Sequence, residues 1–313
     1  MVDFVHLHVH SDYSLLDGAA SVEALASKAA SLGMKHLALT DHGNMFGALK
    51  FLNACLGGDD HPLKDRAPVH PIIGSEFYIA PDSRLNRKYA REDEKYYHLV
   101  LLAANEEGYR NLMKLSSLAY IEGFYMRPRI DKELLERCHE GLICLSACLQ
   151  GEIPFLILAG RVKEAEETAL WFNRLFGQDN FYLEIQDHGI EAQKKVIPVI
   201  AEMSRRTGIP LVATNDIHYL EREDAVAQDL LLCIGTQDKR NDPKRKFKFE
   251  GEEFYFKTGD EMAALFAGYP EAVANTVRIA ERCKTEIPKP GPLLPDFAIP
   301  PGFADADGYL RRL

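Results

Sequence analysis

Long apolar runs are missing from this sequence of 313 residues. No stretch approaches the roughly 20 apolar residues that a membrane-spanning helix needs. The opening MVDFVHLHVH also lacks the basic segment and apolar stretch of a signal peptide. We therefore expect no membrane partner, and a chain that begins directly in structured sequence.

Paired cysteines are missing as well. The six cysteines are scattered and none belongs to a CxxC spacing. This distribution argues against a disulfide framework and against a ribbon-type zinc site, and it favours the reducing cytoplasm. We expect most of these cysteines to behave as small buried apolar residues.

Positive charge is scarce, because 37 Lys and Arg face 47 Asp and Glu, for a formal net charge of −10. A nucleic-acid partner prefers a basic surface. Either the acidic groups bind metal ions, or a nucleic acid is held mainly by sequence outside this chain, and we expect both. The 46% hydrophobic and 27% charged content is that of a globular protein, with room for one large α/β unit or two domains.

Apolar runs alternate with segments of helical periodicity over most of the chain. The predicted strands are 4–7, 36–40, 72–79, 98–103, 142–145, 181–185 and 210–213. The predicted helices between and after them are 22–32, 45–55, 107–120, 152–158, 162–176 and 191–207. Strands that alternate with helices predict an α/β fold with a parallel sheet, here a distorted TIM-like (β/α)7 barrel of about seven βα units.

The character of the sequence changes after residue 218. A helix predicted at 224–234 is followed by the basic stretch KRNDPKRKFKF, another helix at 270–284 and a Pro-rich segment. We therefore predict a barrel domain at 1–235 and, at 236–313, a basic loop, a helix and a Pro-rich linker.

Metal-capable side chains recur where the predicted strands end, which is where barrel enzymes place their sites. His8 and His10 share one face of a strand because they are two residues apart. Asp17 follows in the turn SLLDG, and Glu76 is an acid inside an apolar run, which is costly to bury unless paired or metal-bound. One such residue is commonly structural, but their recurrence at so many strand ends indicates a metal cluster at the carboxyl-terminal rim.

The motifs HLHVHSDYSLLDG, ALTDHGNMFG, GSEFY, LSACLQGE and VATNDIHY occur in this order. They resemble those of the polymerase and histidinol phosphatase (PHP) family, most closely its branch fused to the bacterial replicative polymerase. The resemblance implies three divalent metal ions, zinc or manganese with magnesium or iron as alternatives. It implies nine ligands: His8, His10, Asp17, His42, Glu76, His98, Cys148, Asp216 and His218. Stand-alone members commonly have His at the positions of Asp17 and Cys148, and a thiolate at Cys148 favours zinc.

The resemblance also implies an activity, namely metal-dependent phosphoester hydrolysis and 3′–5′ exonuclease proofreading during DNA replication in the bacterial cytoplasm. Asp216 and Glu76 are expected to bridge ions, because a carboxylate has two oxygens to share, and His188 to position or protonate the leaving group. The implied partners are the primer 3′ end of DNA, the rest of the polymerase chain, and through it the sliding clamp and other replisome subunits. The nucleotidyltransferase site of the polymerase is expected outside these residues.

Two basic segments are candidates for DNA contact. One is the run that contains Lys244, Arg245 and Lys246, although charge runs are usually solvated faces. The other is Arg127 and Arg129 in YMRPRI, a pattern that arginines packed against carboxylates would share.

Two further interpretations stay open. The domain could be a non-catalytic scaffold that metals hold together, or a stand-alone phosphatase of the histidinol-phosphate kind. The complete ligand set favours a nuclease over a scaffold, and the Pro-rich exit argues against the stand-alone enzyme.

Overall fold

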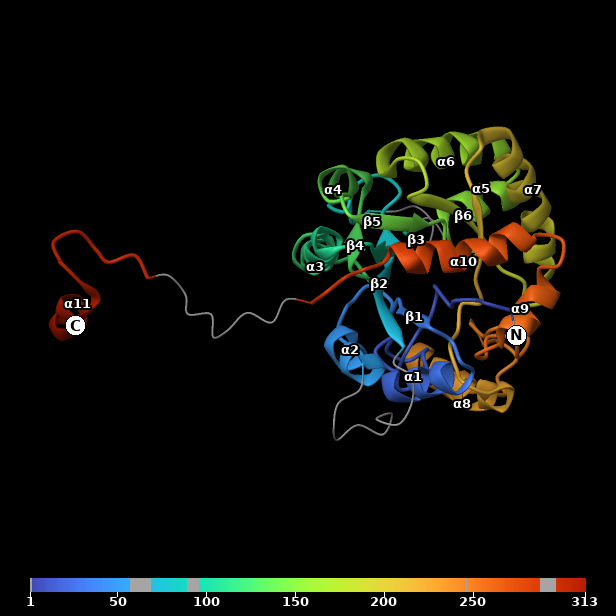
Figure 1. Cartoon of the computed structure of the whole chain (residues 1–313), viewed down its shortest axis with the longest axis horizontal. Helices are drawn as coiled ribbons and strands as arrows, with labels where there is room; N and C mark the ends of the chain where they lie inside the picture. Colours follow the sequence, from blue (N-terminus) through green and yellow to red (C-terminus); the bar gives the residue numbers. More distant parts are fainter. Residues whose placement is uncertain (1, 57–68, 89–95, 246, 288–296) are drawn as a thin grey trace.

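The computed structural model of this protein describes residues 2–56, 69–88, 96–245, 247–287 and 297–313. A curled sheet lies at the centre of the molecule and helices surround it (Figure 1). Its strands are β1 (His36–Leu39), β2 (His70–Ile79), β3 (Tyr97–Ala103), β4 (Arg129–Ile130), β5 (Leu142–Leu145), β6 (Phe181–Ile185) and β7 (Leu211–Ala213). The helices are α1 (Val22–Ser31), α2 (Ala48–Leu56), α3 (Glu106–Ile121), α4 (Lys132–Arg137), α5 (Glu152–Leu158), α6 (Val162–Phe176), α7 (Glu191–Thr207), α8 (Ala225–Thr236), α9 (Gly259–Leu265), α10 (Pro270–Arg282) and α11 (Ala306–Arg312). The predicted α/β class is confirmed.

The strand directions are mixed, which corrects the prediction of a parallel sheet. The order is β1-β2-β3-β5-β6-β7, with β4 beside β2. The pairs β1–β2, β5–β6 and β6–β7 are parallel, but β3 is antiparallel to both β2 and β5. Every residue of β3 is buried, so its sequence is a continuous apolar run. Such a run is also typical of a parallel strand, and for that reason it could not reveal the direction.

Residues 6–10 connect the two edge strands of the curled sheet. On one side the amides of Ala38 and Thr40 donate to the carbonyls of His6 and Val9. On the other side the amide of His10 donates to the carbonyl of Ile217, just beyond β7. The segment carries a single isolated bridge and is not a regular strand, so the strand predicted at 4–7 is corrected.

Helix α10 covers the end of the sheet at which β7 begins. Asn275 donates through Nδ2 to the carbonyl of Leu211 at 2.7 Å, and Thr276 accepts from the amide of Val5 at 3.1 Å. Its Ile279 and Ala280 join the side chains inside the curled sheet in one apolar cluster. The division of the chain at residue 235 stays a prediction, and residues on both sides of that point share this core.

Local signals explain which elements could be predicted. Ser21 caps α1, because its side chain accepts from the amide of Ala24, and serine is a favoured residue at this position. Helices α4 and α9 were not predicted; they are only six and seven residues long, and each lies between segments without a regular apolar period. Among the described residues no helix combines the length and the apolar character that crossing a membrane requires.

Candidate metal centre

Nine side chains meet at one end of the curled sheet, opposite the end covered by α10. They come from residues 6–10 and the turn that follows, from β2 and β3, and from the segments just after β1, β5 and β7. They are the nine predicted ligands: His8, His10, Asp17, His42, Glu76, His98, Cys148, Asp216 and His218. Their convergence on one rim is a property of the structure, whereas their role as ligands remains a prediction.

Glu76 lies at the centre of this cluster. Its Oε1 is 3.0 Å from Nδ1 of His98 and 3.3 Å from Nε2 of His8. Its Oε2 is 2.8 Å from Nδ1 of His42 and 3.4 Å from Nε2 of His10. A carboxylate with imidazole nitrogens around both oxygens has the arrangement needed to share its oxygens between cations.

Asp216 forms a second centre beside it. Its Oδ1 is 3.3 Å from Nε2 of His8, 3.2 Å from Nε2 of His10 and 3.6 Å from Nδ1 of His218. The backbone of Asp216 has a φ of 47°, in the left-handed region that glycine, asparagine and aspartate adopt more readily than other residues.

Asp17 and Cys148 complete the two sides of the cluster. Oδ2 of Asp17 is 3.1 Å from Nε2 of His42, and both side chains are partly exposed. Sγ of Cys148 is 3.7 Å from Nδ1 of His98 and 3.8 Å from Oε1 of Glu76. Cys148 is partly exposed as well, so the cluster reaches solvent at Asp17, His42 and Cys148.

Buried polar atoms without a hydrogen-bond partner gather in this cluster. Buried polar groups in proteins are nearly always hydrogen-bonded, so each exception needs a cause. Seven of the nine residues, and the neighbouring Glu184, have such an atom: His8 Nε2, His10 Nε2, Asp17 Oδ1, His42 Nδ1, Glu76 Oε2, Asp216 Oδ1, His218 Nε2 and Glu184 Oε2. Nitrogen and oxygen donors of this kind, with a thiol beside them, fit divalent cations well.

A carboxylate that was not predicted orients His8. Oε1 of Glu184 accepts from Nδ1 of His8 at 2.7 Å and from Nε2 of Gln186 at 2.9 Å. This bond favours the Nδ1–H tautomer, so that the lone pair of Nε2 faces Glu76 and Asp216 and is available to a cation. Glu184 stands inside the apolar run FYLEI, and the argument that singled out Glu76 applies to it equally.

Ser14 and Asp41 hold the other histidine of the first motif. Oγ of Ser14 is 2.9 Å from Nδ1 of His10 and donates to Oδ1 of Asp41 at 2.9 Å. Burial raises the pKa of Asp41 to about 6, against the hydrogen bonds from Ser11 and Ser14, which lower it. The Nε2 atoms of His8 and His10 thus both face the cluster because a side chain behind each ring is bonded to Nδ1.

Burial and neighbouring charges act in opposite directions on the acids and bases of the cluster. Burial would raise the pKa of Glu76, but His98, His8 and His42 bring it well below its ordinary value. Burial raises the pKa of the Cys148 thiol well above its ordinary value, and Glu76 and Asp216 add to that effect. A thiolate at Cys148 therefore needs a cation beside it, which is what a metal ion provides.

His188 is predicted to position or protonate the leaving group, and that role stays a prediction. Nε2 of His188 donates to the carbonyl of Asn215 at 2.9 Å, and Nδ1 accepts from Nε2 of Gln193 at 2.8 Å. Burial lowers the pKa of His188 to about 4. Both ring nitrogens are engaged in a buried, neutral side chain, so His188 supports the segment that carries Asp216.

Arg129, a predicted DNA contact, lies in the interior of the protein. The residue is 0% exposed, and its Nη2 donates to the carbonyls of Arg84 at 3.0 Å and Asn86 at 2.7 Å. Its guanidinium therefore fastens the chain after β2 and is not accessible to a phosphate.

The remaining basic candidates differ in what their side chains contact. Arg245 forms an ion pair with Asp229 at 2.6 Å, and its side chain is almost wholly buried. Lys244 is exposed, and Lys246 lies outside the described residues. Arg127 is exposed and lies over the ring of Tyr78, with 5.6 Å between its guanidinium carbon and the ring centre. Arg127 and Lys244 thus stay candidates, and Arg245 is committed to Asp229.

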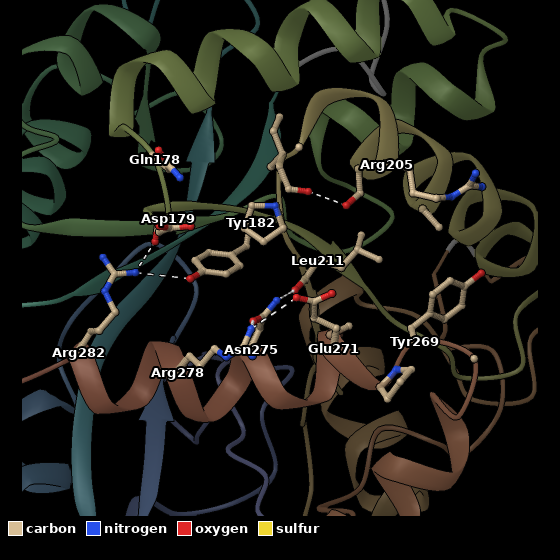
Figure 2. A pocket seen from close by; sticks show the side chains of 18 residues that line it. Gln178, Asp179, Tyr182, Arg205, Leu211, Tyr269, Glu271, Asn275, Arg278 and Arg282 are labelled. Atoms are coloured by element: carbon tan, nitrogen blue, oxygen red, sulfur yellow. Dashed lines mark hydrogen bonds and ion pairs between the residues drawn. The ribbon is translucent and has the colours of Figure 1, made fainter.

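A cavity of about 1,090 Å³ lies at the opposite end of the sheet and contains none of the nine residues. Figure 2 shows Arg278, Arg282 and Asn275 of α10 on one side of it, with Tyr182 of β6 and Leu211 of β7 facing them. Nη1 of Arg278 donates to Oδ1 of Asn275 at 2.8 Å, and Arg282 donates to the carbonyl of Asp179. These polar groups already have partners within the protein, in contrast to the cluster at the rim.

Comparison with known proteins gives three findings. The sequence profile of the PHP domain matches residues 6–188. The DNA polymerase III subunit alpha of Treponema pallidum is 56% identical over 312 residues, which is 100% of this chain and 26% of that protein. The subunit alpha of Borreliella burgdorferi is 52% identical over 311 residues, 99% of this chain and 26% of that protein. The chain thus spans about a quarter of the length of these relatives.

A solved structure of an amidohydrolase from Chromobacterium violaceum overlaps 69% of this chain and 88% of its own, with 17% identity and a TM-score of 0.41, and nothing is inferred from so distant a likeness. The PHP profile is different in weight, because it covers more than half of the chain and includes seven of the nine clustered residues. This chain belongs to the PHP domain family.

Proposed function

We propose that this chain is the PHP domain of a DNA polymerase III subunit alpha, and that it hydrolyses phosphoesters as a metal-dependent 3′–5′ exonuclease. The observation that carries the hydrolytic proposal is the set of unpartnered donor atoms that converge at one rim. The identity to the alpha subunits of Treponema pallidum and Borreliella burgdorferi supports the polymerase context.

The donor set supports more than one cation. Single ions in proteins take about four to six or more ligands, and nine residues with two central carboxylates exceed the needs of one. We propose three divalent ions held by the nine residues, with Glu76 and Asp216 shared between them. Such ions supply Lewis acidity to a phosphoester and make water a nucleophile at neutral pH.

The residues of this chain have separate tasks in that proposal. Glu184 and Ser14 orient His8 and His10, and His188 holds the carbonyl of Asn215 next to Asp216. Asp17 and His42 lie on the open side of the cluster, where a substrate has access.

The proposed partners are the 3′ end of a DNA primer, the rest of the polymerase chain, and through it the sliding clamp and other replisome subunits, in the bacterial cytoplasm. Polymerisation needs a pair of carboxylates on a palm that positions a primer terminus. The acids of the rim are already committed to the cluster, so we expect no nucleotide incorporation by these 313 residues.

A scaffold that is stabilised by metal is the second candidate. One observation favours it: the donors run from His8 to His218, so bound ions would fasten the first residues of the chain to the segment after β7. Ion binding would then stabilise the fold without any hydrolysis. The stand-alone histidinol-phosphate phosphatase has no such observation in its favour.

One experiment separates these candidates. The purified chain is analysed for bound metal and then incubated with a primer that carries a 3′ mismatch, beside the variants Asp216→Asn and Cys148→Ser. We expect the wild-type chain to retain divalent ions and shorten the primer, and both variants to lose activity together with metal. Metal retention and metal-dependent stability without any primer shortening would replace the nuclease by the scaffold.

A further inference from the structure

A second cavity opens directly onto the candidate metal centre. It has a volume of about 230 Å³, and Asp17 and His42 line it, so its floor is the partly exposed side of the cluster. Pockets for drug-sized molecules usually measure about 300–1,000 Å³. This cavity suits one ring system and excludes a duplex.

Aromatic rings form much of the wall of this cavity. Phe46, Tyr120 and Phe247 line it and are 60%, 41% and 41% exposed. The ring centres of Phe46 and Tyr120 are 6.3 Å apart, at 39° to each other. Exposed ring faces beside a cavity are the platforms on which proteins stack unpaired bases. They come from three separate parts of the chain, so no single helix accounts for their meeting.

Arg127 supplies positive charge at the same cavity. Its guanidinium lies over Tyr78, and the nearby phenols of Tyr78 and Tyr96 raise its pKa above the ordinary value. Within the part of the chain that the structure describes, no carboxylate is in ion-pair contact with Arg127. A guanidinium without such a partner is well suited to a phosphate oxygen, to which it can donate two parallel hydrogen bonds.

We infer that this cavity binds the unpaired terminal nucleotide of a single DNA strand. The base stacks on the rings of Phe46, Tyr120 or Phe247, and Arg127 contacts the phosphate that enters the metal centre between Asp17 and His42. The inference rests on the proposed function, since it assigns the substrate end to that site. Stacking ignores base identity, so the cavity selects for an unpaired end and not for a sequence.

The test is a binding measurement on the metal-loaded chain with two labelled single-stranded oligonucleotides. Both end in a phosphorothioate linkage that resists cleavage, and one has an abasic residue in place of the 3′-terminal nucleotide. We expect the abasic end to bind about tenfold more weakly, because stacking of one base is worth roughly that factor or more. Phe247→Ala and Phe46→Ala should each reduce the difference between the two oligonucleotides, the double variant should remove it, and Phe46→Trp should keep it.

Phe124→Ala is the matched control, because Phe124 is 49% exposed and close to Tyr120 but does not line the cavity. Equal binding of the two oligonucleotides by the wild-type chain would overturn the inference, and the exposed rings would then be left for a protein partner. Cleavage is measured separately on unmodified strands. If the chain cleaves DNA but binds the two oligonucleotides equally, only the assignment of the cavity to a nucleotide is wrong. If it binds the intact end more tightly but does not cleave, only the proposed hydrolysis is wrong.

Discussion

The two ends of the curled sheet differ in how their polar groups are satisfied. At the end covered by α10, a cavity of about 1,090 Å³ is surrounded by arginines and an asparagine that bond to one another and to backbone carbonyls. At the rim, the space is smaller, yet buried nitrogens and oxygens lack partners. Buried nitrogens and oxygens without hydrogen-bond partners therefore indicate the functional end of this molecule better than the size of a cavity does.

The strongest way to test this contrast is to neutralise a rim carboxylate. Asp216→Asn keeps the side-chain shape and a residue that tolerates the left-handed backbone, but it removes the negative charge. We expect the rate of hydrolysis to fall by more than about 100-fold, because loss of a residue that only orients a ligand typically costs about 10- to 100-fold. We expect the amount of bound metal to fall as well. Arg278→Ala at the other end is the control, and it should leave both unchanged, because that side chain is exposed. Equal losses in the two variants would show that the ends do not differ.

Removal of metal should destabilise the fold because the nine predicted ligands at the rim lose their shared ions. An ion present at about 100 times its Kd contributes about 2.7 kcal/mol, which corresponds to a fall in Tm of roughly 4 °C on chelation of a chain of this length. The measurement is a thermal melt with and without a strong chelator, on protein shown beforehand to contain metal. A Tm that does not respond would contradict an occupied site.

Glu184→Gln tests the comparison at a residue that contacts a predicted ligand, His8, but is not itself a predicted ligand. The amide is the same size as the carboxylate but no longer favours the Nδ1–H form of His8 as strongly. We expect metal affinity to fall about 10- to 100-fold, with the far-UV circular dichroism unchanged. Titration of the metal-free chain measures this directly, and the exposed pair formed by Glu191 and Lys194 offers Glu191→Gln as a control. Unaltered affinity in Glu184→Gln would mean that His8 does not depend on this partner.

The smallest expected effect is the pH dependence of stability that comes from His188, a buried histidine next to the cluster. The pKa of His188 is about 4 in the folded chain and about 6.5 when unfolded. Between these values the unfolded chain binds the extra proton, so stability is complete above pH 6.5 and is lost as the pH falls towards 4. From pH 7 to pH 5 this loss is about 2 kcal/mol. Urea unfolding of the metal-free chain should show a shallower pH dependence in His188→Gln than in the wild type. Parallel curves would exclude a neutral His188.

Sequence reasoning predicted a metal cluster at this rim because metal-capable side chains recur where apolar runs end, and the resemblance to the PHP family supplied the set of nine ligands. It failed where the pattern carries no such information. The direction of β3 is hidden by its complete burial. Arg129 and His188 look like surface residues because their partners are backbone carbonyls and, for His188, the side chain of Gln193, and neither kind of partner leaves a mark in the sequence pattern. Glu184 had the signal of an acid in an apolar strand, and its pairing with a histidine 176 residues away depends on the tertiary fold.

Helix α10 also sets the order in which the molecule can be completed. The amide of Val5 bonds to Thr276, a separation of 271 residues, and Ile279 and Ala280 fill the interior beside Leu7. Loop closure over such a distance is slow, and contacts of this kind delay folding. During synthesis the first residues of the chain must therefore wait until nearly all of the later segments have been made before their core can close. Until then His8 and His10 have no fixed position, so the metal centre is completed late in folding.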